Sequence, residues 1–95
     1  MRIARVVGTV TLSQVHPALR GYRWILAMPY SLEALRAGAE PDGEEVIVLD
    51  ELAAAVGQTI GFSEGREAAM PFHPQRKPVD AYSACIVDAI VLDTD

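Results

Sequence analysis

The C-terminal part of the chain, residues 78–92, carries the longest apolar run. Read as a strand, it has apolar or small side chains on both faces. A strand with one face in water should instead alternate apolar and polar residues. We therefore expect one face to line a barrel core and the other to meet another subunit. The two faces are Tyr82, Ala84, Ile86, Ile90 and Leu92, and Ala81, Ser83, Cys85, Val87, Ala89 and Val91.

Shorter runs of β-branched and aromatic residues predict four earlier strands. Gly8 interrupts the first run, and a glycine inside a strand indicates a bulge or a sharp bend. Pro29 should end the second, because proline cannot donate a hydrogen bond to the neighbouring strand. The predicted strands cover residues 3–12, 21–28, 45–50, 58–62 and 78–92.

Two short helical segments are predicted between these strands. Ser31 can cap a helix that Gly38 stops, with Leu32 and Leu35 on one face. Ser63 can cap a second helical turn before the last strand. The order of elements predicts a mainly β fold, namely a small five-stranded, OB-like β-barrel with one or two short helical turns.

Length and composition indicate one domain, residues 1–95, with surface to bury between subunits. A chain of 95 residues is below the usual size for two cores. A hydrophobic fraction of 51% is high for so small a domain. The single Cys85 lies in the apolar last strand, so we expect it to be a small core residue in a reducing, cytoplasmic setting.

The charge argues against nucleic acid as a partner. The net charge is -5, and the basic residues are scattered, whereas phosphate backbones are bound by clustered Lys and Arg. Tyr22 and Trp24 alternate on one strand face and could stack bases, but core packing is favoured. An OB-fold module for single-stranded nucleic acid, or for another small ligand, remains the alternative. We expect no membrane segment and no signal peptide.

Nothing in the sequence assembles a catalytic, cofactor or metal site. His16 and His73 each lie in a predicted loop beside proline, without further ligands at suitable spacing. Asp50 and Glu51 are adjacent, so in a strand they point to opposite faces. We expect a solvated strand end, or a polar contact between subunits, at this pair. The chain is therefore not expected to be an enzyme.

The order of several segments resembles the EutN/CcmL family, the vertex proteins of bacterial microcompartment shells. The segment 48–50 running on to Gly57 differs from the family pattern, because Ala53-Ala54-Ala55-Val56 stands where the family has a glycine-rich loop. Alanine disfavours the positive φ angles that glycine permits. Leu32–Ala39 also looks longer and more helical than the family's polar turn. The segments that carry the resemblance are residues 1–10, 21–26, 48–57, 63–69 and 78–88.

The resemblance implies a structural role in a microcompartment shell. A member of this family would form a homo-pentamer that fills a fivefold corner, beside hexameric shell proteins that tile the facets. It would be a cytoplasmic shell component without cofactor or enzymatic activity. The resemblance and the small side chains place one segment near the ring axis, namely Leu52, Ala53, Ala54, Ala55, Val56 and Gly57.

Overall fold

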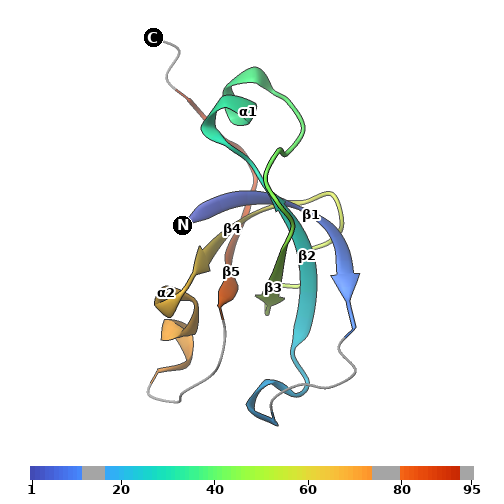
Figure 1. Ribbon diagram of the computed structural model, residues 1–95, viewed down its shortest axis with the longest axis vertical. Helices are drawn as coiled ribbons and strands as arrows, with labels where there is room; N and C mark the ends of the chain where they lie inside the picture. The colour runs from blue at the N-terminus through green and yellow to red at the C-terminus, as the bar shows by residue number, and fades with distance from the viewer. Residues whose placement is uncertain (12–16, 74–79, 93–95) are drawn as a thin grey trace.

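Five strands close into a barrel in the residues that the computed structural model describes, 1–11, 17–73 and 80–92 (Figure 1). The order around the barrel is β1-β2-β3-β5-β4. The small five-stranded β-barrel expected from the sequence is confirmed. The strands are β1 Arg2–Val10, β2 Arg23–Pro29, β3 Val46–Asp50, β4 Thr59–Glu64 and β5 Ala81–Val87. The helical elements are η1 Pro17–Leu19, α1 Leu32–Ala37, α2 Arg66–Ala69 and η2 Met70–Phe72.

Strand β1 lies between β2 and β4 and pairs antiparallel with both. The register against β2 shifts between Val6 and Gly8, which confirms the predicted irregularity at this glycine. Pro29 is the last residue of β2, so the strand ends where proline removes a donor. Among the described residues, no helix has the length and apolar character that crossing a membrane requires.

Strand β5 is shorter than predicted. It covers Ala81–Val87, whereas the apolar run extends to residue 92, and residues 78 and 79 lie outside the described part. The register against β4 places Cys85 opposite Gly61 and Ser83 opposite Phe62. Ala84 is thus the extra residue of a bulge. The apolar run correctly predicted a strand, but it did not show that the strand ends at Val87.

The bulge also makes the predicted faces of β5 wrong. Before it, Ala81 and Ser83 are buried; after it, Ile86 packs against the barrel core, while Ala84 itself is exposed. Because side chains alternate with period two, one extra residue exchanges the two faces beyond it.

The seam between β3 and β5 closes the barrel with little pairing. These strands run parallel, and within the described residues their ladder consists of one pair, Leu49 opposite Tyr82. By contrast, β4 and β5 are paired over six positions. The barrel is therefore continuous but unevenly hydrogen-bonded around its circumference.

Two apolar clusters lie on opposite sides of the β2 and β3 backbones. Ile25 and Ala27 point into the barrel, whereas Trp24 and Tyr22 pack outside it against Leu49. Core packing of the two aromatic residues is confirmed, although in the smaller cluster. The barrel cluster is Ala4, Val6, Ile25, Ala27, Val48, Ala54, Ile60, Phe62 and Ala81. The smaller cluster is Leu19, Leu49 and Ala68, with Tyr22, Trp24, Phe72 and Tyr82 against it.

The first predicted helix is confirmed and the cap of the second is wrong. The Ser31 hydroxyl accepts a hydrogen bond from the Ala34 amide, and Gly38 ends α1 in the left-handed region at φ 63°. Ser63, in contrast, belongs to β4, and α2 begins at Arg66 after Gly65. The strand continues past Ser63 because its pairing with β5 extends to Glu64.

Candidate functional site

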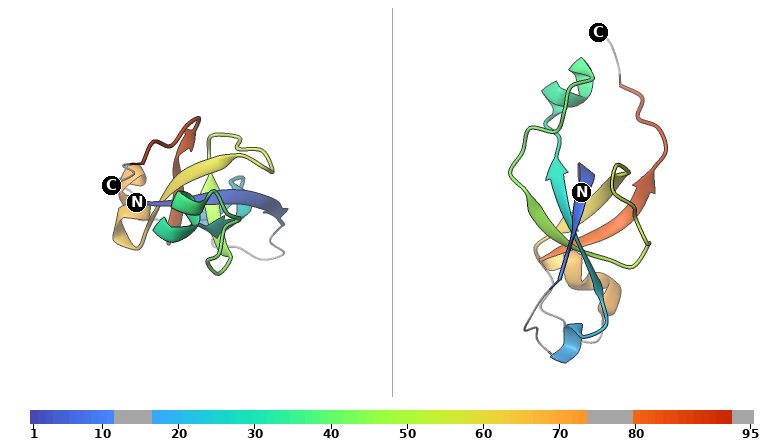
Figure 2. Two further views of the ribbon diagram at one scale, coloured as in Figure 1. Left: turned by 90° about the horizontal axis from the view of Figure 1, so that it is seen from above. Right: turned by 90° about the vertical axis from the view of Figure 1, so that its right-hand side faces the viewer.

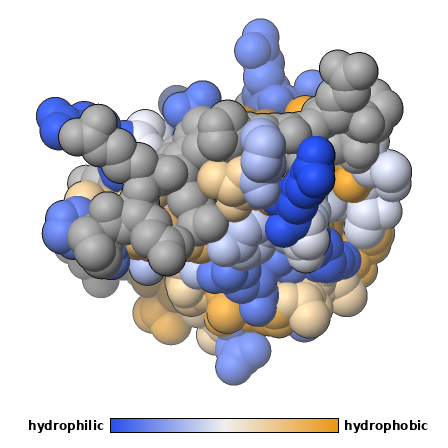
Figure 3. Space-filling view, turned by 90° about the horizontal axis from the view of Figure 1, so that it is seen from below, coloured by the Kyte–Doolittle hydropathy of each residue, from blue (hydrophilic) through white to orange (hydrophobic). Residues whose placement is uncertain are grey.

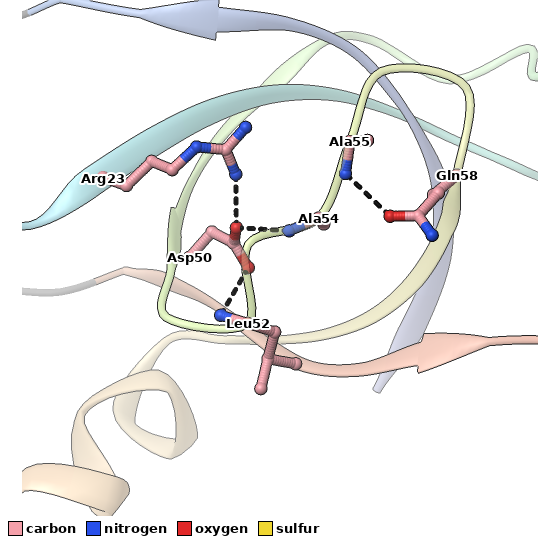
Figure 4. Close-up of polar contacts among 6 residues, drawn as sticks. All are labelled: Arg23, Asp50, Leu52, Ala54, Ala55 and Gln58. Carbon is pink, nitrogen blue, oxygen red and sulfur yellow. Dashed lines mark hydrogen bonds and ion pairs between the residues drawn. The ribbon is translucent and has the colours of Figure 1, made fainter.

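Asp50 organises the loop between β3 and β4, which contains the six residues singled out from the sequence. The carboxylate ends β3 and is 2% exposed. Its Oδ1 accepts from the Leu52 amide at 3.1 Å, and its Oδ2 from the Ala54 amide at 2.9 Å and from Arg23 at 2.5 Å (Figure 4). One buried carboxylate thus holds two loop amides and a β2 guanidinium, which compensates its desolvation.

The expectation of a solvated strand end at Asp50 is wrong. The neighbouring Glu51 is exposed, as expected, but Asp50 is buried within the protomer. An available signal was the short polar side chain before a run of small residues, since aspartate commonly accepts from the amide two residues on. The pairing with Arg23 had no local signal, because Arg23 lies on another strand.

Ala53 has a positive φ angle, the backbone conformation that glycine permits and alanine disfavours. Its φ is 57°, and within the described part of the chain it is the one non-glycine residue with a positive φ. The flanking amides of Leu52 and Ala54 are both held by Asp50, which fixes the turn. The loop therefore keeps a glycine-like turn with an alanine in it, at a cost in backbone strain.

Ala53→Gly is expected to stabilise the protein by about 1 kcal/mol, because glycine adopts this φ without steric cost. The gain is smaller than the full strain, since glycine also adds freedom to the unfolded chain. Chemical denaturation measures it. Ala55→Gly is the control, and it should be neutral or destabilising. A lower stability for Ala53→Gly would contradict the strain.

The second half of the loop forms hydrogen bonds with β1 and within the loop. The Gly57 amide donates to the Val6 carbonyl at 2.8 Å, and the Val6 amide donates to the Gln58 carbonyl at 2.9 Å. Gln58 also accepts from the Ala55 amide through its side chain at 2.7 Å (Figure 4). The loop is thus held at both ends and in the middle.

The six candidate axis residues do not all point the same way. Ala54 is 0% exposed and belongs to the barrel core, so its side chain is not available to another chain. Leu52 and Val56 are 42% and 62% exposed. These two therefore present apolar side chains outward from a loop whose backbone is fixed from within.

Tyr82 and Glu51 form a polar contact beside this loop. The phenol donates to the Glu51 carboxylate at 2.7 Å, and the Phe72 ring packs edge-on against the tyrosine. The hydrogen bond to Glu51, followed by burial and the nearby negative charges, raises the pKa of Tyr82 to about 12. The phenol therefore remains a neutral donor throughout the physiological pH range.

The described residues contain no group of three or more His, Cys, Asp or Glu side chains placed to hold a metal. His73 is exposed, His16 lies outside the described residues, and Cys85 is half-buried on β5. The side chains of Asp50 and Gln58 accept their hydrogen bonds from amides of the loop itself.

Comparison with known proteins assigns this barrel and its loop to a family. Residues 1–88 match the family described as "Ethanolamine utilisation protein EutN/carboxysome". The chain belongs to the EutN/CcmL family. The match includes all five strands and the Asp50 loop, so the resemblance identified from the sequence is confirmed.

Two relatives of this EutN/CcmL chain are described as vertex proteins. It is 31% identical over 90 residues to the bacterial microcompartment shell vertex protein PduN of Salmonella typhimurium, covering 95% of this chain and 98% of the relative. It is 29% identical over 93 residues to the carboxysome shell vertex protein CcmL of Gloeobacter violaceus, covering 98% of this chain and 88% of that one.

Solved structures confirm the EutN/CcmL barrel. The structure of Gloeobacter violaceus CcmL superposes with a TM-score of 0.84 at 28% identity, covering 98% of this chain and 91% of that one. A pentameric microcompartment shell protein, GrpN from Rhodospirillum rubrum, gives a TM-score of 0.81 at 24% identity, covering 98% and 100%.

Proposed function

We propose that this protein is a vertex subunit of a bacterial microcompartment shell and assembles as a homo-pentamer. The main support for this proposal is the family match over residues 1–88, together with relatives described as shell vertex proteins. A closed shell of hexameric tiles needs fivefold positions, and a cyclic ring with heterologous contacts supplies one. The function is then geometric, and catalysis has no part in it.

Exposed apolar side chains support contacts between subunits. Seen from the end at which α2 lies, apolar surface reaches the margin of the molecule (Figure 3). Burial of exposed apolar surface against another chain is favourable. Large apolar side chains exposed on the barrel and its loops include Ile47, Leu52, Val56 and Met70.

The assembly is tested by mass and by shell closure. Native mass spectrometry at micromolar concentration should give five copies, and a predominantly monomeric species would contradict the ring. Co-produced with its cognate hexameric shell proteins, the chain should co-purify in closed shells, whereas shells without it should stay open or grow as sheets and tubes. Electron microscopy decides. Closed, corner-filled shells without any vertex subunit would refute the role.

We further propose that the loop 52–57 lies near the ring axis. The outward side chains of Leu52 and Val56 would then face the axis. Val56→Asp would bring five carboxylates close together and should weaken the ring, because like charges repel. Ring mass against protein concentration measures this. Leu32→Asp is the matched control, since Leu32 is an exposed aliphatic residue on α1. An unchanged ring with Val56→Asp would place the loop elsewhere.

A further inference from the structure

Of the six aspartates in the sequence, Asp42 alone precedes a glycine. It lies in the α1 segment, residues 30–45, which connects β2 with β3. In the right-hand view of Figure 2, this segment rises from one end of the barrel and returns to β3 as an open loop beside α1. Asp42 is exposed, so water reaches its carboxyl group. An aspartate before glycine is chemically distinctive, because no side chain on the next residue hinders the approach of its amide nitrogen.

Such a pair can isomerise with water as its one co-reactant. The Gly43 nitrogen attacks the Asp42 carboxyl carbon, Cγ, and the new N–Cγ bond closes a five-membered succinimide ring. The amide proton and the carboxyl hydroxyl leave together as water. Water then opens the ring at either carbonyl. Opening at the α-carbonyl leaves Gly43 bonded to Cγ, which is an isoaspartate of unchanged mass.

Ser31 holds both oxygens of this carboxyl group. Oδ1 accepts from the Ser31 amide at 2.8 Å, and Oδ2 accepts from the Ser31 hydroxyl at 2.6 Å. The bond from the hydroxyl, followed by the bond from the amide, lowers the pKa of Asp42. The group is therefore kept as a carboxylate, which is a poor electrophile because neither oxygen leaves as water until a proton is added.

The attacking nitrogen is held as well. The Gly43 amide donates to the Pro29 carbonyl at 2.9 Å. A β-carbon at residue 43 would lie 3.0 Å from the Pro29 Cβ and 3.1 Å from the Pro29 carbonyl oxygen. Both distances are shorter than ordinary van der Waals contact, so a side chain here would displace the end of β2. Packing thus favours the glycine that makes Asp42 reactive.

We propose that the Asp42-Gly43 pair is a modification site at which the chain isomerises spontaneously to isoaspartate. The contacts with Ser31 and Pro29 restrain the reaction, so it proceeds when the segment opens locally. Isomerisation turns Cγ into a backbone carbonyl, which removes the carboxylate from Ser31. Because the Ser31 hydroxyl also accepts from the Ala34 amide, the product should have a looser α1. The inference goes beyond the vertex role and does not depend on it.

The test incubates the full chain at physiological temperature and pH. Methyl transfer from S-adenosylmethionine by an isoaspartyl methyltransferase counts isoaspartate, and mass spectrometry of peptides locates it at residue 42. The chain unfolded in guanidinium chloride should react about tenfold or more faster than the folded chain, because it loses the hydrogen bonds to both Asp42 oxygens. Isoaspartate formed chiefly at another aspartate, none formed in either state, or equal rates in the two states would overturn the proposal.

Variants separate the restraint by Ser31 from the stability of α1. Ser31→Ala removes the hydroxyl bond and should raise the rate about fivefold or more, whereas Ser31→Thr keeps a hydroxyl and should react as the wild type does. Ala37→Gly weakens α1 at its other end and should leave the rate unchanged. Asp42→Glu should abolish the signal. Circular dichroism verifies folding. No rise with Ser31→Ala, or an equal rise with Ala37→Gly, would overturn the proposal.

Discussion

Replacing Asp50 by alanine is expected to lower the free energy of unfolding by about 2–4 kcal/mol. The change removes the acceptor for two loop amides, and a buried unsatisfied donor costs about 1–3 kcal/mol. It also removes the ion pair with Arg23. In a domain of this size the loss corresponds to a fall in Tm of about 10–25 °C. Thermal and chemical unfolding followed by circular dichroism measure it.

Two further substitutions isolate the cause. Glu51→Ala removes the adjacent, exposed carboxylate and should cost less than about 1 kcal/mol, because exposed polar contacts contribute little. Asp50→Asn preserves the shape and one acceptor, so its stability should lie between those of Asp50→Ala and the wild type. If Asp50→Ala were no worse than Glu51→Ala, the carboxylate would not be organising the loop.

Ala54→Asp is expected to prevent the barrel from folding. Its side chain would enter the apolar cluster beside residues such as Ile60 and Phe62, where Ala54 is fully buried. A carboxyl group without a prepared partner there costs several kcal/mol, about as much as a small domain has in total. Circular dichroism and the yield of soluble protein should both show the loss.

Ala55→Asp is the matched control for this substitution. Ala55 is the next residue in the same loop and is exposed, so the barrel should keep its secondary structure and its cooperative unfolding. Any effect of Ala55→Asp should appear in ring mass. A folded Ala54→Asp variant with unchanged stability would show that the side chain leaves the core.

Local signals in the sequence were sufficient for the order of elements and for several boundaries. Gly8 marked an irregularity in β1, and the Ser31 and Gly38 caps marked both ends of α1. Each depends on backbone requirements of a few neighbouring residues, which sequence carries directly. Alternating and apolar runs then predicted five strands, and the number of strands in a short chain indicated the barrel.

Features that depend on pairing between distant strands were not predictable. The bulge at Ala84 exists because the β4 register shifts after Gly61, and it exchanged the faces assigned to β5. Likewise, Ser63 was expected to start a helix, but pairing with β5 keeps it in a strand. The sequence pattern of one strand contains no information about its register against the neighbouring strand.

The candidate site was located as a segment but not resolved into side chains. The small residues of the loop marked a place of close approach, yet they could not show that Ala54 turns inward while Leu52 and Val56 face out. That division follows from the two amides held by Asp50 and from the positive φ of Ala53. The burial of Asp50 depends on Arg23, a residue 27 positions away.

The short parallel contact between β3 and β5 gives the barrel one compliant side. In the described residues it has a single pair, Leu49 with Tyr82, whereas β1 and β2 pair at six positions. Local opening starts where backbone hydrogen bonds are fewest. We therefore expect the wall to open first along this line, while the antiparallel ladders remain intact.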